Sequence, residues 1–144
     1  LLDAISVNGT ASVSLLNLIA EKMEYQGHGT ICVITSVAGD RGRATNYVYG
    51  ASKKLVSTFL EGLGQRLNKC GVRILDIRPG FVKTPMTSEF DQSGLLWSKP
   101  ETIAKSIHCA IKKSQGVVYT PWFWRYIMLI VRFLPRRIFD KLNF

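Results

Sequence analysis

The most informative stretch of this chain is Tyr49-Gly-Ala-Ser-Lys53, with Ser36 thirteen residues before the tyrosine. If residues 45–69 form a helix, Tyr49 and Lys53 lie one turn apart on the same face, and the ammonium is expected beside the phenol. A phenol titrates near about pH 10, and a neighbouring cation lowers its pKa toward that of a working general acid or base. The spacing therefore predicts a proton-transfer site, to which Ser36 adds a second hydroxyl.

Helical and strand-forming segments alternate along the chain, which is typical of an α/β fold with a parallel sheet covered on both faces. The predicted helices span about residues 2–25, 45–69 and 100 onward, and the predicted strands span residues 30–35, 72–77 and 116–120. The third helix is marked by the capping box Ser98-Lys-Pro-Glu101. Such sheets bind ligands beyond the carboxyl ends of their strands, so Ser36 and the Pro79-Gly80 turn are expected to face one crevice.

The central helix is expected to bury an apolar stripe. A helical period selects Val48, Ala51, Leu55, Phe59, Leu63 and Leu67. Because Tyr49 and Lys53 fall on a different side of this helix, they can face the crevice while the stripe packs. The polar segment 86–98 follows the Pro79-Gly80 turn, and by position alone it is either a mobile lid or an ordinary connecting loop.

Four motifs occur together in a fixed order, and in all four the chain resembles the short-chain dehydrogenase/reductase family. The motifs are Val7-Asn-Gly-Thr10, Ser36, Tyr49-X-X-X-Lys53 and Val72-Arg-Ile-Leu-Asp-Ile-Arg-Pro-Gly-Phe-Val-Lys-Thr-Pro85. A Tyr and Lys pair alone occurs by chance on many helices, but four ordered motifs are a specific signal. The resemblance implies an NAD(P)-dependent oxidoreductase that transfers hydride between nicotinamide and a ketone or secondary alcohol. It also favours the lid for segment 86–98, which covers substrate and cofactor in that family.

The resemblance further implies a role for each site residue. Tyr49 would give a proton to the carbonyl oxygen, Lys53 would lower the tyrosine pKa and bind the nicotinamide ribose, and Ser36 would hydrogen-bond the substrate oxygen. Asn8 would hold a water that links Lys53 to solvent, although an asparagine near a helix start is more often a cap or a surface residue. The residues that would lie along the nicotinamide are Pro79, Gly80, Val82 and Thr84.

All four motifs belong to the second half of that family's Rossmann-like, doubly wound parallel sheet. A dinucleotide fold opens with a Gly-rich turn that binds the pyrophosphate, and this sequence contains no such turn. We therefore expect the C-terminal half of a family member: about three strands with flanking helices in residues 1–120, and a basic, apolar helical tail of the same domain in residues 121–144. The choice between NAD and NADP stays open, because the residue that reads the ribose 2′ position belongs to the first half. A truncated, inactive chain and a non-enzymatic membrane-associated binding protein are the alternatives.

Composition fits one globular unit, with 47% hydrophobic and 20% charged residues among 144. Neither the histidines nor the cysteines, at positions 28, 32, 70, 108 and 109, have metal-ligand spacing, so no metal site is predicted. Unpaired thiols indicate a reducing compartment, and we expect a cytoplasmic location. The net charge of +9 suits an anionic dinucleotide or substrate. Nucleic acid is not an expected partner, because the basic residues form no recognition motif.

The C-terminal tail interleaves bulky apolar residues with Arg125, Arg132, Arg136, Arg137 and Lys141. Its longest uncharged apolar run, Tyr126–Val131, is far shorter than the roughly 20 residues that a transmembrane helix needs. An apolar helical stripe beside arginines, broken or kinked at Pro135, suits peripheral membrane contact through residues 122–144. It equally suits packing against the tail's own domain or a sister subunit.

The tail and the segment 40–50 together resemble one branch of the family, the reductases of decaprenylphosphoryl-2-keto-erythropentose. That resemblance implies a keto sugar on a polyprenyl phosphate as the substrate, while other small-molecule or lipid-linked ketones and alcohols stay open. Family members commonly pair through their two long helices, here near residues 2–25 and 46–69. A homo-oligomer is therefore expected.

Overall fold

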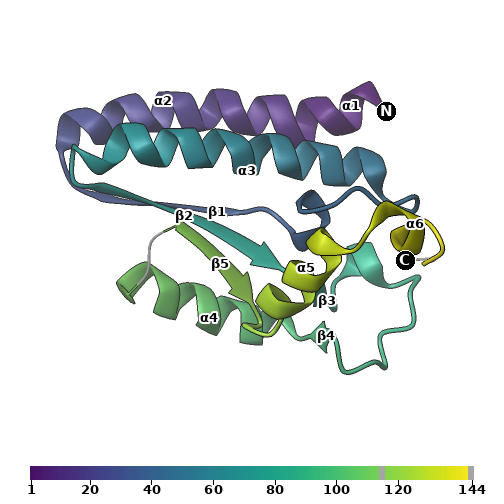
Figure 1. Ribbon diagram of the computed structural model, residues 1–144. Coiled ribbons are helices and arrows are strands. Elements are labelled where there is room, and N and C mark those ends of the chain that lie inside the picture. Colours follow the sequence, from purple (N-terminus) through teal and green to yellow (C-terminus); the bar gives the residue numbers. More distant parts are fainter. Residues whose placement is uncertain (114–115, 143–144) are drawn as a thin grey trace.

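The computed structural model describes residues 1–113 and 116–142 and contains a three-stranded parallel sheet between helical layers (Figure 1). The sheet has the order β1-β2-β5, with β1 at Gly29–Ile34, β2 at Val72–Pro79 and β5 at Gly116–Thr120. One helical layer holds α1 (Leu2–Ile5), the π-helical turn η1 (Ser6–Thr10), α2 (Ala11–Gln26) and α3 (Tyr47–Asn68), and the other face carries α4 (Pro100–Lys113). The predicted α/β architecture is confirmed. Residues 143–144 of the predicted tail lie outside the described residues.

β2 is the central strand, and its sequence explains its place. Its parallel register with β1 runs from Gly29↔Val72 to Ile34↔Ile77, and its register with β5 runs from Leu75↔Gly116 to Pro79↔Thr120. Leu75 and Ile77 are fully buried toward α4, as expected of a parallel strand covered on both faces. The opposite face of β2 meets α3.

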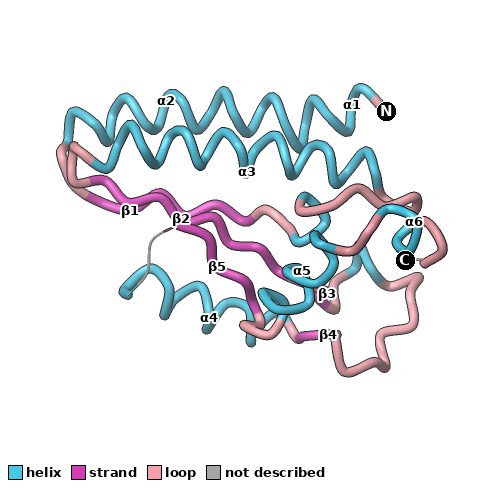
Figure 2. The backbone as a smooth tube through the Cα atoms, viewed as in Figure 1, coloured by secondary structure: helices cyan, strands magenta, loops and turns pink. Residues whose placement is uncertain are grey.

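The two crossovers of this sheet have opposite hands. The connections β1-α3-β2 and β2-α4-β5 step in the same direction across the sheet, yet α3 and α4 cover opposite faces (Figure 1). Because about 98% of parallel crossovers are right-handed, one of these two is an exception. The segment 80–99, which joins β2 to α4, lies at the carboxyl edge of the sheet (Figure 2).

Helix α3 buries a different stripe from the predicted one. Its buried residues include Ser52, Val56, Ser57, Leu60, Leu63 and Leu67. Ala51 is exposed and Leu55 is 42% exposed, so the prediction was wrong for these two residues. The reason is that α3 packs against the sheet on one side and against α1, η1 and α2 on another, which turns Leu55 toward Gly9 of η1.

α1, η1 and α2 form one continuous helical run, Leu2–Gln26. By length and composition alone, this run is long and apolar enough to cross a membrane. This is weak evidence, because packed helices of soluble proteins pass the same test. The run packs against α3 through Leu16 and Ala20. Its opposite face exposes Leu15, Leu18 and other apolar residues.

The C-terminal tail folds into two short helices, α5 (Trp124–Phe133) and α6 (Arg136–Phe139), separated at Pro135 as its sequence predicts. The inner face of α5 buries Trp124, Met128 and Val131 in one apolar cluster with Val37. The guanidinium of Arg41 donates to the carbonyl of Leu134 at 2.7 Å and to that of Val131 at the end of α5. The tail is therefore fixed to the loop that follows β1.

Candidate active site

Ser36 and Tyr49 meet beyond the carboxyl end of β1. Ser36 lies two residues past the last strand residue, where its hydroxyl accepts a hydrogen bond from the Ala38 N–H at 3.1 Å and caps the turn η2 (Val37–Gly39). Tyr49 lies in the first turn of α3, and its phenol is close enough to Ser36 for that hydroxyl to lower its pKa. The structure thus places together two of the residues that the sequence predicts at a site.

Two glycines allow this approach between η2 and α3. A Cβ atom at Gly50 would lie 2.7 Å from the carbonyl oxygen of Ala38, and one at Gly39 would lie 2.9 Å from the backbone nitrogen of Lys54. Both clashes involve backbone atoms, which cannot rotate away as a flexible side chain can. Because glycine lacks Cβ, these positions bring the Ser36 turn against the first turns of α3.

We expect Gly50→Ala to lower both stability and turnover. The added methyl group forces apart η2 and α3, and overpacking of this kind costs about 1–3 kcal/mol. Gly62→Ala is the matched control on the same helix, because a Cβ there meets nothing within 4 Å. It should instead stabilise the protein by about 0.5–1 kcal/mol. Thermal unfolding of both variants measures the difference, and equal midpoints for them would contradict the close-approach argument.

Lys53 lies one helical turn after Tyr49, on the same side of α3. Its ammonium Nζ lies 5.6 Å from the centroid of the Tyr49 ring and donates to the carbonyl oxygen of Ile34 at 3.4 Å. Ser36, Tyr49 and Lys53 are therefore gathered at the carboxyl end of β1, as the sequence predicts.

The pKa of Tyr49 differs in direction from the sequence-based expectation. Burial raises it above the ordinary phenol value, and the Ser36 hydroxyl only partly opposes this rise. Burial also lowers the pKa of Lys53, because an ammonium is disfavoured where water is removed. The Lys53 cation stands over the face of the Tyr49 ring, and the pKa shift of Tyr49 is caused by burial and, in the opposite direction, by Ser36.

Asn8 lies in the π-helical turn η1, which packs against α3. Its side-chain amide donates to the carbonyl of Ala4 at 3.1 Å, within its own helix. The next residue, Gly9, is buried over Ser52, the neighbour of Lys53. A π-turn inside an α-helix often marks a functional position. The turn η1 packs against α3 close to Ser52, the residue before Lys53. The role of Asn8 in a water relay stays a prediction.

The Pro79-Gly80 turn leaves β2 toward the same edge of the sheet. The Gly80 N–H donates to the Thr120 carbonyl at 3.1 Å, and a Cβ at Gly80 would lie 1.9 Å from the Trp124 indole. Phe81 continues this aromatic contact, with ring centroids 5.0 Å from Trp124 and 5.2 Å from Trp97. Only glycine fits at position 80, because the Trp124 indole packs directly against the backbone of the turn.

Val82 and Thr84 are held by one threonine side chain. The Thr87 hydroxyl donates to the Val82 carbonyl at 2.7 Å and accepts from the Thr84 N–H at 3.1 Å. These are backbone groups of the segment that the resemblance places along a nicotinamide. Whether they turn toward a cofactor stays a prediction.

The sequence did not predict a second, small sheet beside this turn. It pairs β3 (Phe81–Val82) in parallel with β4 (Trp97–Ser98), and the Lys83 N–H donates to the Ser98 carbonyl at 2.9 Å. Both ends of segment 86–98 are therefore fixed close together. The predicted lid is a loop anchored at its base.

A buried ionic network, also missed by the sequence reasoning, connects the segments of the site. Arg78 pairs with Asp40 at 2.6 Å and with Asp76 at 2.7 Å, and all three side chains are at least nine-tenths buried. The Asp76 carboxylate also accepts from the hydroxyl of Thr35, the neighbour of Ser36. Tyr119 of β5 donates to Asp40 at 2.7 Å. One signal in the sequence could have predicted part of this network. Asp76 and Arg78 are two residues apart in an otherwise apolar strand, and this spacing places both side chains on the same face of the sheet.

These contacts set the charge state of the network. Burial alone lowers the pKa of Arg78, but the nearby carboxylates of Asp76 and Asp40 outweigh it and the net shift is upward. Burial first, and then the hydrogen bond to Asp40, raise the pKa of Tyr119. Arg78 therefore stays charged between two carboxylates. Together these side chains join the loop after β1, the end of β2 and β5.

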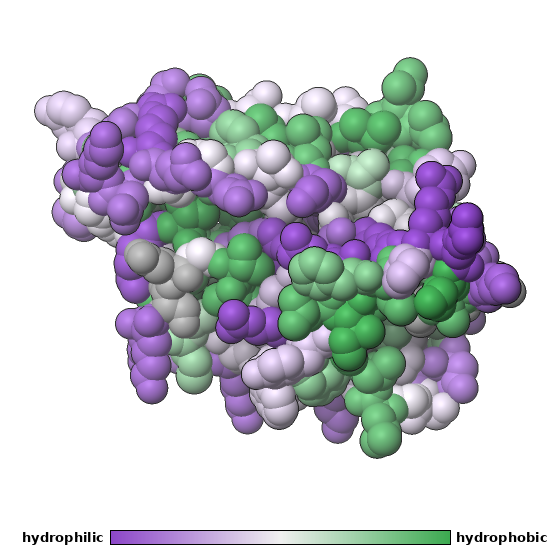
Figure 3. Space-filling view, viewed as in Figure 1, coloured by the Kyte–Doolittle hydropathy of each residue, from purple (hydrophilic) through white to green (hydrophobic). Residues whose placement is uncertain are grey.

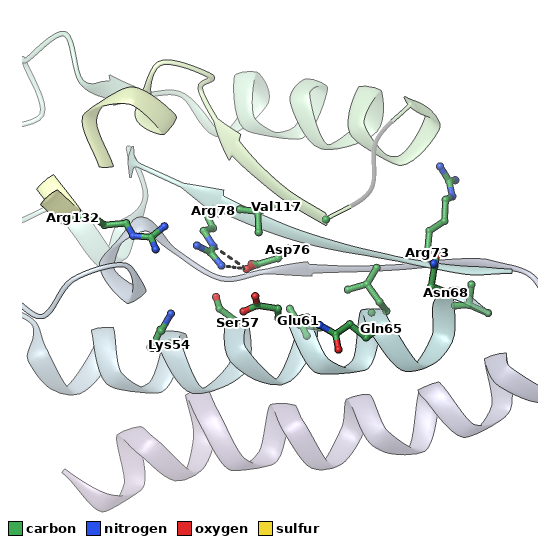
Figure 4. A pocket seen from close by; sticks show the side chains of 15 residues that line it. Lys54, Ser57, Glu61, Gln65, Asn68, Arg73, Asp76, Arg78, Val117 and Arg132 are labelled. Atoms are coloured by element: carbon green, nitrogen blue, oxygen red, sulfur yellow. Dashed lines mark hydrogen bonds and ion pairs between the residues drawn. The ribbon is translucent and has the colours of Figure 1, made fainter. Parts of the chain in front are cut away.

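One cavity in the described part of the chain is not lined by the predicted site residues. It has a volume of about 550 Å³ and lies between α3 and the sheet, where Figure 4 shows Asp76 and Arg78 facing Ser57 and Glu61. A smaller cavity of about 130 Å³ lies beside the Pro79-Gly80 turn. It is lined by Arg43, Phe81, Leu96, Trp124, Ile127, Met128 and Val131. The smaller cavity adjoins the candidate site, because Phe81 and Trp124, which line it, also lie at the Pro79-Gly80 turn. In residues 1–113 and 116–142 no group of three or more His, Cys, Asp or Glu is placed to hold a metal ion.

Comparison with known proteins agrees with this geometry. Residues 2–94 match the sequence profile of the short chain dehydrogenases. The chain is 39% identical over 132 residues to the uncharacterized oxidoreductase MT2133 of Mycobacterium tuberculosis, covering 92% of this chain and 53% of that protein. It is 37% identical over 144 residues to an uncharacterized oxidoreductase of Streptomyces coelicolor, covering 98% of this chain and 57% of that protein. The chain belongs to the short-chain dehydrogenase family, and it spans about half the length of the curated relatives it matches.

A solved structure confirms the fold independently. The crystal structure of a short chain dehydrogenase from Burkholderia cenocepacia, in complex with NADP, matches with a TM-score of 0.81. The match covers 97% of this chain and 57% of that chain at 16% sequence identity. At this identity the likeness concerns the fold alone, and it confirms the predicted Rossmann-like sheet.

Proposed function

We propose that Ser36, Tyr49 and Lys53 form the proton-transfer site of a nicotinamide-dependent oxidoreductase that interconverts a ketone and a secondary alcohol. One observation carries the proposal: Ser36, Tyr49 and Lys53 are gathered at the carboxyl end of β1, with the Lys53 ammonium 5.6 Å from the Tyr49 ring centroid and 3.4 Å from the Ile34 carbonyl oxygen. The carboxyl edge of a parallel sheet is where such folds bind ligands. Membership of the short-chain dehydrogenase family supports the same chemistry.

In this proposal Tyr49 is the general acid of carbonyl reduction. Its phenol is protonated at neutral pH, because burial raises its pKa, and it can donate to the substrate oxygen as that oxygen gains charge. Ser36, which lies beside Tyr49, can turn its single O–H group toward the same oxygen and stabilise the developing charge. In alcohol oxidation the same tyrosine accepts the proton.

The residues fit a nicotinamide nucleotide by the chemistry of their donors. The Lys53 ammonium has three N–H groups, and its contact with the Ile34 carbonyl is a long one at 3.4 Å, so ribose hydroxyls suit the remaining donors. Pro79, Gly80, Val82 and Thr84 are the further proposed cofactor contacts, and Asn8 the proposed water ligand. NADH or NADPH would supply the hydride in carbonyl reduction, and the oxidised form would accept it in alcohol oxidation.

The cavity beside the turn supports an apolar ketone as substrate. Phe81, Trp124 and Met128 form apolar walls, and Arg43 contributes a cation whose pKa burial lowers. A keto sugar on a polyprenyl phosphate is the narrower substrate proposed from sequence resemblance, and the comparisons add no support for it. No observation favours an inactive chain or a non-enzymatic binding protein.

Oligomer formation and cytoplasmic location stay predictions. The exposed apolar residues Leu15 and Leu18 on α2 support pairing through the α2–α3 layer. Sedimentation of the complete protein would measure this pairing directly.

Cofactor binding tests the proposal. The complete protein encoded by the reading frame that contains these residues is titrated with NADH and NADPH, and nicotinamide fluorescence is followed. We expect saturable binding of at least one, weakened by Lys53→Met. Lys54→Met is the matched control, because Lys54 follows on the same helix and is exposed. Absence of binding, or equal weakening by the two variants, would contradict the proposed role of Lys53.

The raised pKa of Tyr49 predicts opposite pH dependences for the two directions. Reduction needs the neutral phenol, so its rate should stay level up to about pH 10 and fall only above the tyrosine pKa. Oxidation needs the phenolate, so its rate should rise by up to about tenfold per pH unit below that pKa. Initial rates in both directions between about pH 7 and pH 10 measure this. A level oxidation profile over this range would point to another base.

A further inference from the structure

The outer face of α5 is an apolar surface with no covering element in the part of the chain that the structure describes. Tyr126, Leu129, Ile130 and Phe133 recur at spacings of three and four, so they share one face of the helix. All four are exposed, and Phe133 reaches 79% exposure. Trp122, just before the helix, stands edge-on to Tyr126 with ring centroids 6.0 Å apart and extends this face. We call these five residues the α5 surface.

The α5 surface is rigidly held, unlike a loose tail. The opposite face of the same helix buries Trp124, Met128 and Val131, and Arg41 fixes its last turn through backbone carbonyls. One face of α5 therefore completes the domain core while the other offers apolar side chains to an external medium. Apolar residues therefore occupy both the buried and the outer face of α5, and only the edge with Arg125 and Arg132 is charged.

Basic side chains surround the α5 surface. Residues 121–142 contain five basic residues, Arg125, Arg132, Arg136, Arg137 and Lys141, against one acidic residue, Asp140. All five are exposed. Arg125 and Arg132 lie seven residues apart and follow one edge of the apolar face. Figure 3 shows apolar atoms gathered over α5 with hydrophilic atoms beside them.

From this arrangement we infer that the α5 surface is a docking site for an anionic lipid bilayer. Tryptophan and tyrosine favour the interface between lipid and water, and exposed aliphatic and aromatic side chains enter the acyl boundary. Arginines at the rim attract anionic headgroups. A second copy of this chain is a poorer occupant, because it would bring the same excess of positive charge to the contact. The inner face of α5 borders the Pro79-Gly80 turn, so docking would hold the candidate site close to the membrane.

Vesicle flotation of the complete protein tests the inference. We expect binding to vesicles of phosphatidylcholine with phosphatidylglycerol, weak binding to phosphatidylcholine alone, and loss of binding at high salt. Arg125→Gln and Arg132→Gln should each weaken binding about fivefold. The double variant Ile130→Ser/Phe133→Ser should weaken it by about tenfold or more. The matched control is Ile111→Ser, an exposed apolar position on α4 outside the proposed pairing layer, which should bind as the parent does.

A second readout is independent of affinity. Brominated lipids should quench tryptophan fluorescence on binding, and Trp122→Phe should remove a large part of this quenching while the thermal midpoint stays unchanged. Failure of the parent protein to bind anionic vesicles would overturn the inference. So would equal binding by the parent and the Ile130→Ser/Phe133→Ser variant. If that variant instead converts a dimer to a monomer while the parent binds no vesicles, the surface belongs to a second copy.

Discussion

Tyr49→Phe should lower turnover of the complete protein by about 10²–10⁴-fold, because proton transfer by a positioned side chain contributes roughly that factor. The substitution removes only the hydroxyl, which lies close to Ser36, and the ring keeps its place beside Lys53. Cofactor affinity should therefore stay close to that of the parent. Steady-state rates and a nicotinamide titration of the same preparation separate the two effects.

Tyr47→Phe is the matched control for this variant. Tyr47 lies two residues earlier in the same helix and is 62% exposed, so its side chain points away from Ser36. We expect its rate and affinity to remain those of the parent. Equal losses from both substitutions would mean that the helix start, and not the Tyr49 hydroxyl, governs activity.

Arg78→Met should destabilise the protein strongly. The substitution leaves the carboxylates of Asp40 and Asp76 buried without their cation, and breaking a buried ion pair in this way costs about 3–5 kcal/mol. Unpaired buried carboxyls have a folded-state pKa raised above the unfolded value. The deficit should therefore be complete at neutral pH and shrink as the pH falls through that raised pKa and the carboxyls become protonated.

Urea unfolding of Arg78→Met at neutral and mildly acidic pH measures this behaviour. Arg66→Met is the control, because the Arg66–Glu24 pair is on the surface and should have a far smaller effect. The variant Asp40→Asn/Asp76→Asn/Arg78→Met, which removes all three charges, should recover part of the lost stability. Equal unfolding midpoints for Arg78→Met and Arg66→Met would contradict the role given to the network.

Local patterns in the sequence predicted that Ser36, Tyr49 and Lys53 lie at one end of the sheet, while their catalytic roles stay a prediction. The four-residue spacing of Tyr49 and Lys53, and the position of Ser36 after a β-branched run, each depend on one helix or one strand. The periods of 3.6 and 2 residues are local properties, so such placements can be read from the sequence. The break of the tail at Pro135 is equally local.

Features that depend on distant partners could not be predicted in this way. Asp40 and Arg78 are 38 residues apart, and no local pattern pairs them. The parallel pairing of β3 with β4 joins two-residue strands that are too short to recognise. The buried face of α3 differs from the predicted apolar stripe. Ser52 is buried beside Gly9 of η1, whereas Leu55, which also approaches Gly9, remains 42% exposed. The raised pKa of Tyr49 likewise depends on burial by the whole fold.

Hydride transfer from a nicotinamide cofactor, completed by proton transfer from Tyr49 beside Ser36, is the reaction that we propose at the end of β1. Its most direct test uses cofactor deuterated at nicotinamide C4, the complete protein and a panel of apolar ketones. We predict that deuterium appears on the carbinol carbon of at least one product, and that Tyr49→Phe abolishes this transfer while still binding the cofactor. Equal transfer by the parent and by Tyr49→Phe would contradict the account.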